Sequence, residues 1–266
     1  MLPPVIETHG LTRRFGELTA VDGLDLAIAA GELYGFLGPN GAGKTTTMRM
    51  LAGLLKPDAG GMRLAGIDPA AAPREARAAT GFVPDTPPLY EHLTGRQHVG
   101  LVASLYGVPA ADRDRRADEL LEAFGLAGRA DELIKGYSHG MRKKLHLAAV
   151  LVTRPEVLLL DEPTTGLDPR SARTLKDLLQ AFCHDGGTVM LSTHLLDTAE
   201  RLCHRVGILD HGRLRAEGDV TELLGGGALG TLEDVFLRLT AEGGGPAEGA
   251  AAGAAEPGAD ARPAQG

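Results

Sequence analysis

Residues 38–45 read G-P-N-G-A-G-K-T, which fits the phosphate-loop pattern G-x-x-x-x-G-K-[ST] at every required position. The apolar run 32–37 before the motif predicts a strand, and the run 45–51 after it predicts a helix. This context distinguishes a phosphate-binding loop from an ordinary glycine turn, because the loop N–H groups and the helix N-terminus then face one anion together. The motif therefore predicts a site for a nucleoside triphosphate.

Within this loop the two residues that follow the last glycine carry the chemistry. Lys44 supplies an ammonium for the β- and γ-phosphates, and Thr45 offers its hydroxyl to Mg²⁺. The cofactors expected are ATP and Mg²⁺. The residues expected to hold the nucleotide are Asn40, Gly41, Ala42, Gly43, Lys44, Thr45 and Thr46.

The composition restricts the partners of the chain. Its 266 residues carry a formal net charge of −8, whereas a broad nucleic-acid-binding surface needs an excess of Lys and Arg. The longest apolar runs, such as 147–152, fall far short of the roughly 20 residues that a spanning helix needs. The N-terminus lacks the pattern of a secretory signal. We therefore expect a cytoplasmic protein that binds no nucleic acid and does not cross a membrane itself.

Hydrophobic patterning predicts alternating strands and helices, interrupted by a helical stretch from about 93 to 152. Short helices are expected at 171–183, 195–202 and 231–239, the last with Thr231 as its N-cap. The tail 241–266 consists mostly of Ala, Gly and Pro, which predicts disorder. Strands are expected at 5–8, 24–28, 32–37, 62–66, 81–84, 157–160, 188–192 and 206–209.

A second chemical signal is the pair Asp161 and Glu162, which follows the apolar run 157–160. Such a run predicts a strand buried on both faces, and α/β sheets place their ligand sites at the carboxyl ends of strands. Asp161 is expected to hold Mg²⁺ through water, and Glu162 to orient and deprotonate the attacking water.

A third signal is the sequence Ser138-His139-Gly140 at the start of a predicted helix. The N–H groups and the positive end of the helix dipole there could bind a phosphate. An ordinary N-cap by Ser138 explains the same residues, so both interpretations stay open.

Taken together, these motifs resemble the nucleotide-binding subunits of ABC transporters. The phosphate loop, Ser138 with Gly140, the run 160–163, the run 166–168 and His194 occur in the order of that family and span about residues 5–240. The resemblance implies an α/β fold with a P-loop NTPase core, that is, a RecA-like, mostly parallel sheet. It also implies an N-terminal antiparallel β subdomain and an inserted α-helical subdomain at about 90–153, within an ATPase domain of residues 1–240.

The resemblance also implies roles for individual residues. Phe15 matches the aromatic residue that stacks on adenine, although a core residue at a strand edge is the alternative. His194 matches the histidine that contacts the γ-phosphate, and Asp168 matches a loop that couples two subunits. In the family, Ser138 and Gly140 of one subunit complete the ATP site of another. Catalysis is thus assigned to Glu162, His194 and Lys44.

Two departures from the family pattern affect the site. His139 and Met141 stand where the family usually has glycine and glutamine. Asp85 stands where the family usually has a glutamine that reaches Mg²⁺ and the transport subunit. A carboxylate is also an oxygen ligand suited to a hard cation, so the metal ligands expected are Thr45, Asp85 and Asp161. The alternative is that Asp85 points to solvent.

Together with the segments 89–96 and 232–236, both departures resemble those of one branch of the family, mostly exporters, in which a separate chain forms the membrane permease. This implies a homodimer, or a heterodimer with a related ATPase subunit, that is peripheral to the inner face of the membrane through the permease. Two alternatives are a non-transport ABC ATPase and a regulatory module that binds ATP without cleaving it. The sequence does not name the cargo or prove the direction of transport.

Overall fold

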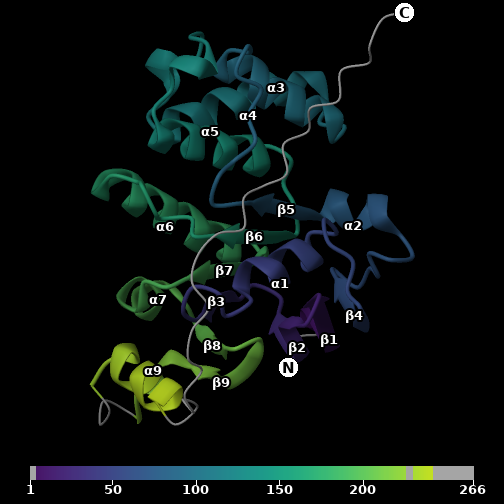
Figure 1. Ribbon diagram of the computed structural model, residues 1–266. Helices are drawn as coiled ribbons and strands as arrows, with labels where there is room; N and C mark the ends of the chain where they lie inside the picture. The colour runs from purple at the N-terminus through teal and green to yellow at the C-terminus, as the bar shows by residue number, and fades with distance from the viewer. Residues whose placement is uncertain (1–3, 226–229, 242–266) are drawn as a thin grey trace, which may run out of the picture.

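A computed structural model describes residues 4–225 and 230–241 of the chain (Figure 1). The strands form a three-stranded sheet in the order β2-β1-β4 and a six-stranded sheet in the order β5-β6-β7-β3-β8-β9. Their bounds are β1 Pro4–Phe15, β2 Leu18–Ala29, β3 Leu33–Leu37, β4 Ala59–Leu64, β5 Thr80–Val83, β6 Val157–Asp161, β7 Thr188–Thr193, β8 Arg205–Asp210 and β9 Arg213–Asp219. Every predicted strand overlaps one of these.

Helices separate most of the strands along the chain. Short 3₁₀ turns, η1 Ala127–Arg129 and η2 Ile134–Gly136, lead into α5. The helices are α1 Lys44–Leu51, α2 Pro73–Ala79, α3 Gly95–Leu105, α4 Ala110–Ala123, α5 His139–Leu151, α6 Pro169–His184, α7 Leu196–Leu202, α8 Val220–Leu223 and α9 Leu232–Ala241.

The small sheet is antiparallel, and its first two strands are longer than their sequence patterns predict. β1 pairs with β2 and β4 over most of its length, but the pairing shifts register at several points. Each shift breaks the two-residue alternation of inward and outward side chains, so the pattern at 5–8 reveals only the first part of a twelve-residue strand.

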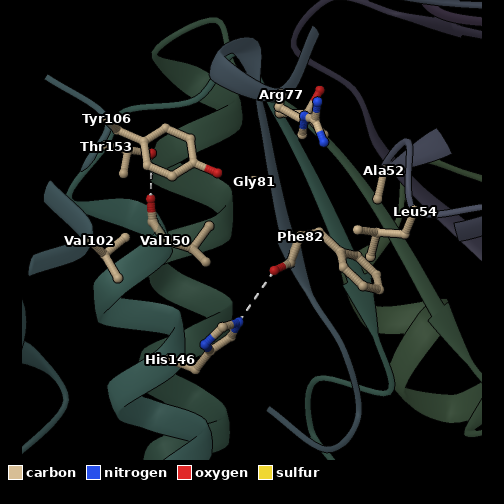
Figure 2. A pocket seen from close by; sticks show the side chains of 11 residues that line it. Ala52, Leu54, Arg77, Gly81, Phe82, Val102, Tyr106, His146, Val150 and Thr153 are labelled. Atoms are coloured by element: carbon tan, nitrogen blue, oxygen red, sulfur yellow. Dashed lines mark hydrogen bonds between the residues drawn. The ribbon is translucent and has the colours of Figure 1, made fainter. Parts of the chain in front are cut away.

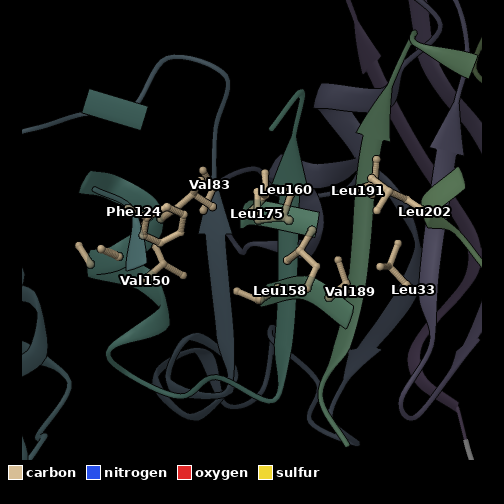
Figure 3. Packing of buried hydrophobic residues seen from close by; sticks show 14 of the residues in the cluster. Leu33, Val83, Phe124, Val150, Leu158, Leu160, Leu175, Val189, Leu191 and Leu202 are labelled. Carbon is tan, nitrogen blue, oxygen red and sulfur yellow. The ribbon is translucent and has the colours of Figure 1, made fainter. Parts of the chain in front are cut away.

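The large sheet is parallel from β5 to β8, with β9 added antiparallel at one edge. Its central strands β3, β6 and β7 are buried on both faces, as the continuous apolar run 157–160 predicts for β6. Leu158 and Leu160 belong to one hydrophobic cluster with Leu175 of α6 (Figure 3). Leu159 between them belongs to a second cluster, which includes Met48 of α1. Helices on both faces therefore fix this sheet and the positions of its strand ends.

Helices α3, α4 and α5 lie between β5 and β6 in the chain and form a layer beyond the β5 edge of the sheet (Figure 1). Thr94 starts α3 with a capping box, in which its side chain and that of Gln97 each accept a backbone N–H. The three helices fall inside the expected insertion at 90–153, while the domain boundaries themselves stay a prediction.

The C-terminal part shows what the patterns missed. β9 has no run of buried side chains, because it pairs only at the sheet edge and alternates exposed with half-buried positions. The helix predicted at 231–239 is confirmed as α9, and the Thr231 hydroxyl accepts the N–H of Asp234 at 3.3 Å. Ala241 is the last residue of α9, and residues 242–266 of the predicted disordered tail lie outside the described residues. Among the helices of the described ranges, none is long and apolar enough to cross a membrane.

Candidate nucleotide-binding site

The phosphate loop connects β3 to α1, and neighbouring backbone leaves room for glycine alone at its two ends. Gly43 has a φ of 107° as the N-cap of α1, and a Cβ there would lie 2.3 Å from the carbonyl oxygen of Ala20. A Cβ on Gly38 would lie 2.4 Å from the carbonyl oxygen of Leu209. Only glycine accepts the left-handed backbone at Gly43 and the close approach at both positions, so the glycines of the loop allow it to pack against β2 and β8.

Lys44 is buried against this loop. Its Nζ donates to the carbonyl oxygens of Gly38 at 2.7 Å and Pro39 at 3.1 Å. Burial lowers the pKa of Lys44, and the carboxylates of Glu162 and Asp161 oppose that shift. The ammonium is thus held at the inner wall of the loop and balanced by two acids.

A pocket of about 390 Å³ opens in front of the loop. It gathers ten of the residues that the sequence predicts for the site, together with Leu18 and Ala20 of β2, which the sequence analysis missed. Ala42 is buried instead, with 3% of its surface exposed. The lining residues are Phe15, Leu18, Ala20, Asn40, Gly41, Gly43, Lys44, Thr45, Thr46, Asp85, Asp161 and Glu162.

Phe15 is the last residue of β1 and lies at the rim of this pocket. Its side chain is 46% exposed, which does not fit a core residue. The guanidinium of Arg13 lies over the ring, 4.7 Å from its centroid, in a cation–π contact. Arg13 also pairs with Asp58 at 3.0 Å, so the ring is held from one side by an anchored arginine.

Asp161 ends β6 beneath the phosphate loop and is buried. Its Oδ2 accepts from the hydroxyl of Thr45 at 2.8 Å, and its Oδ1 accepts from the hydroxyl of Ser192. These are oxygen groups, the ligands that Mg²⁺ takes. The described residues contain no group of three His, Cys, Asp or Glu side chains able to hold a metal. The hydroxyl of Thr45 and the carboxylate of Asp161 are the groups here that fit a hard cation.

Glu162 occupies a strained position next to Asp161. Its φ is 48°, which costs a residue with a Cβ on the order of 1–3 kcal/mol. Its N–H donates to the carbonyl of Ser192 at 3.0 Å, and its carboxylate contacts Nδ1 of His194 at 2.8 Å and the hydroxyl of Thr193 at 3.3 Å. Glu162 and His194, each predicted separately to be catalytic, are thus in direct contact.

Ser138, Gly140 and Asp168 lie outside the pocket. Ser138 is an N-cap, because its hydroxyl accepts the N–H of Met141 at 3.3 Å. Asp168 caps α6, and hydrogen bonds from Ser171, with a further one from Lys144, hold the pKa of Asp168 well below its usual range. Ser138 and Asp168 are exposed, and their predicted roles at a site shared by two subunits stay a prediction.

Asp85 follows β5 and lines the pocket, but one of its oxygens is already engaged. Its Oδ1 accepts from Nζ of Lys143 at 3.0 Å. Lys143 is fully buried on α5, and the sequence offers no signal that separates it from its basic neighbours Arg142 and Lys144. Asp85 is thus neither free in solvent nor wholly available to a metal.

Comparison with known proteins agrees with this geometry. The ABC transporter family matches residues 21–165. The daunorubicin/doxorubicin resistance ATP-binding protein DrrA of Streptomyces peucetius is 46% identical over 218 residues, which cover 82% of this chain and 66% of that protein. The Nod factor export ATP-binding protein I of Ralstonia nicotianae is 40% identical over 221 residues, which cover 83% of this chain and 69% of that protein.

A solved structure of an ATP-binding subunit of an ABC transporter superimposes with a TM-score of 0.84 at 32% sequence identity. The match covers 89% of this chain and 99% of that chain. The predicted α/β class with a P-loop NTPase core and an antiparallel N-terminal sheet is confirmed. The chain therefore belongs to the ABC transporter family and is one of its ATP-binding subunits, the subunits whose ATP hydrolysis drives transport.

Proposed function

We propose that this chain powers an exporter from the cytoplasmic side of the membrane, through a separate permease subunit. The observation that carries the proposal is the pocket in which the phosphate loop meets Asp161 and Glu162. The export direction rests on relatives whose names describe drug resistance and Nod factor export. In this proposal the chain is peripheral to the membrane and associates with the bilayer through the permease.

The residues of the pocket have different roles in phosphoryl transfer. Lys44 and the N–H groups of the phosphate loop hold the β- and γ-phosphates, while Phe15 stacks on adenine. Glu162 accepts the proton of the attacking water. His194 orients this carboxylate through Nδ1, which leaves Nε2 for the γ-phosphate. Positioning and charge neutralisation then supply most of the rate.

A second copy of the chain, or a related ATPase subunit, completes the site. Ser138 and Gly140 at the start of α5 lie outside the pocket, and Asp168 lies beside them through its contact with Lys144. Facing subunits would bring the N-terminus of α5 to the phosphates held by the partner, where the helix dipole favours an anion.

An apolar groove supports docking on a permease. Its volume is about 250 Å³, and it lies between β5 and the helices α3 and α5 (Figure 2). Phe82, Val102 and Val150 line it, and Leu54 and Tyr106 at its rim are largely exposed. Exposed apolar side chains around one groove are typical of a protein interface. The occupant we infer is an apolar segment on the cytoplasmic face of the permease.

Replacing Glu162 by glutamine tests the function. We expect kcat for ATP hydrolysis to fall about 10²- to 10⁴-fold, since this is the usual contribution of a general base. ATP should still bind, and light scattering should show a dimer with ATP that is more stable than that of the unchanged chain. The control is Glu122→Gln on the exposed face of α4, which should leave phosphate release unchanged. Normal turnover by Glu162→Gln would refute the assignment of the base.

The proposed metal is Mg²⁺, held by Thr45 and Asp161 and by the second carboxylate oxygen of Asp85. Replacing Asp85 by alanine removes that ligand, so the Mg²⁺ concentration for half-maximal phosphate release should rise about tenfold. Asp85→Gln should give a smaller rise, because its amide oxygen can still coordinate. If Asp85→Ala keeps both the Mg²⁺ requirement and the rate, Asp85 is not a ligand.

A further inference from the structure

Lys143 is a fully buried lysine at the junction of three chain segments. Its side chain has no exposed surface, a rare state for lysine unless every N–H is used. Nζ donates to Oδ1 of Asp85 at 3.0 Å and to the carbonyl oxygens of Glu162 at 2.6 Å and Thr165 at 3.0 Å. The three donors of the ammonium are therefore all satisfied.

These acceptors lie in the two loops that shape the pocket beyond the phosphate loop. Asp85 belongs to the segment after β5, whereas Glu162 and Thr165 belong to the segment after β6. Lys143 itself lies in α5, the helix that Ser138 caps. One ammonium thus joins the inserted helices to both loops at the sheet edge.

The contact with Glu162 has a direct consequence for the carboxylate. Glu162 keeps its positive φ because its N–H and its carbonyl oxygen are both held, the first by Ser192 and the second by Lys143. The direction of the side chain follows from this backbone conformation. Lys143 reaches the carbonyl and not the carboxylate, so it acts on the reaction through Glu162.

Asp85 supplies the negative charge for this ammonium. A buried cation that loses its counter-ion is strongly destabilising, whereas carbonyl oxygens alone offer only dipoles. The Asp85 side chain is about half exposed and lines the nucleotide pocket. A change at the pocket can therefore reach Glu162 through the pair of Asp85 and Lys143.

We propose that Lys143 is a positioning residue for ATP hydrolysis: its ammonium, balanced by Asp85, fixes the loop 162–168 so that the Glu162 carboxylate meets the attacking water. This inference rests on the role of Glu162 in the proposed function. It adds that the orientation of Glu162 is set from α5, outside the nucleotide pocket.

The first test measures the loop without nucleotide or Mg²⁺, by hydrogen–deuterium exchange of peptides that cover residues 162–168. Lys143→Met keeps the volume and removes the donors, so exchange in this loop should become at least about fivefold faster. Asp85→Asn, at a half-exposed side chain, should give a smaller increase in the same peptides, and its effect cannot pass through the metal. The control Lys176→Met, whose ammonium donates to the carbonyl of Arg201, should leave the loop unchanged. Unchanged exchange at 162–168 in Lys143→Met and in Asp85→Asn would overturn the proposal.

The second test separates positioning from folding and from binding. In Lys143→Met, kcat for ATP hydrolysis should fall at least about tenfold while the affinity for ATP changes less than about threefold. Lys143→Gln, which retains two N–H donors, should recover part of kcat. Equal losses in kcat and affinity, or no recovery by Lys143→Gln, would reduce Lys143 to a structural role. If Glu162→Gln proved fully active while exchange at 162–168 responded as expected, the base assignment would fail and the anchoring by Lys143 would stand.

Discussion

The loop after β3 and the loop after β6 both reach the nucleotide pocket, yet they are held in different ways. The phosphate loop depends on its own glycines, which let it pack closely against the backbone of β2 and β8, and its lysine bonds to carbonyl oxygens of the same loop. The loop after β6 has a strained residue, Glu162, held by side chains and backbone from α5 and from the end of β7. In the proposed function, the first loop binds the phosphates, and the second supplies the general base, whose charge changes during the reaction.

This difference indicates which of the two loops can respond to changes elsewhere in the protein. A loop whose conformation is local keeps its shape when the rest of the domain moves, which suits a binding cradle. A loop whose conformation depends on distant groups responds when those groups shift. Because α5 lines the apolar groove proposed for the permease and also holds Lys143, binding at that groove can reach Glu162 through α5.

The largest expected effect comes from breaking the local loop. Gly43→Ala places a Cβ against the carbonyl oxygen of Ala20 and strains a left-handed backbone, so the loop must open. We expect ATP affinity to fall about 100-fold or more, equivalent to about 3 kcal/mol, as measured by calorimetry. The control is Gly53→Ala, which also has a positive φ but meets no atom within 4 Å and should keep its affinity. Tight ATP binding by Gly43→Ala would show that the loop tolerates change and that the comparison is wrong.

The same contrast explains which features of the fold and the site can be predicted from the sequence. The strands β3 and β6 can be predicted from their apolar runs, and the phosphate loop can be predicted from glycines and a lysine within eight residues. Asp161 and Glu162 follow because they end such a strand. All of this information is local in the chain, and the structure brings these residues to one pocket as predicted.

The features that the sequence does not reveal depend on tertiary contacts. Lys143 follows Arg142 and precedes Lys144, and nothing in that run tells which side chain is buried. Only packing of α5 against the loops decides it. Leu18 and Ala20 enter the pocket because β2 turns back along β1 beside Phe15. The same holds for β9, whose mostly polar sequence becomes a strand because the edge of β8 is open for pairing.

The second-largest expected effect is a loss of stability at low pH. It tests whether the packing of α5 supports the loop after β6. Nε2 of His146 in α5 contacts the carbonyl oxygen of Phe82 in β5 at 3.4 Å (Figure 2). Burial lowers the pKa of His146 from 6.5 to about 4; the contact with the Phe82 carbonyl opposes this shift, and His98 adds to it. The unfolded chain therefore takes up the proton at a higher pH than the folded chain. The unfolding free energy should fall as the pH drops from 6.5 towards 4, by about 2 kcal/mol between pH 7 and pH 5.

The measurement is urea denaturation at both pH values, with His146→Gln as the comparison variant. Glutamine can donate to the same carbonyl but does not titrate, so its loss between pH 7 and pH 5 should be about 2 kcal/mol smaller. Hydrogen exchange in the unchanged chain at pH 5, corrected for the intrinsic rate, should rise in residues 162–168 before it rises in 38–45. Equal pH dependence in both proteins would mean that His146 is not buried as a neutral ring.

The smallest expected effect distinguishes the binding of adenine from the binding of the phosphates of ATP. Phe15 lies at the pocket rim with Arg13 over its ring, and its proposed contact is with adenine alone. Phe15→Ala should weaken ATP binding by about 1–2 kcal/mol, the usual contribution of one stacked base, and Phe15→Tyr should restore it. Inorganic triphosphate should bind both variants as it binds the unchanged chain, because the phosphate loop does not depend on β1. If triphosphate affinity falls as much as ATP affinity in Phe15→Ala, the ring supports the loop itself, and the phosphate cradle is less local than its glycines indicate.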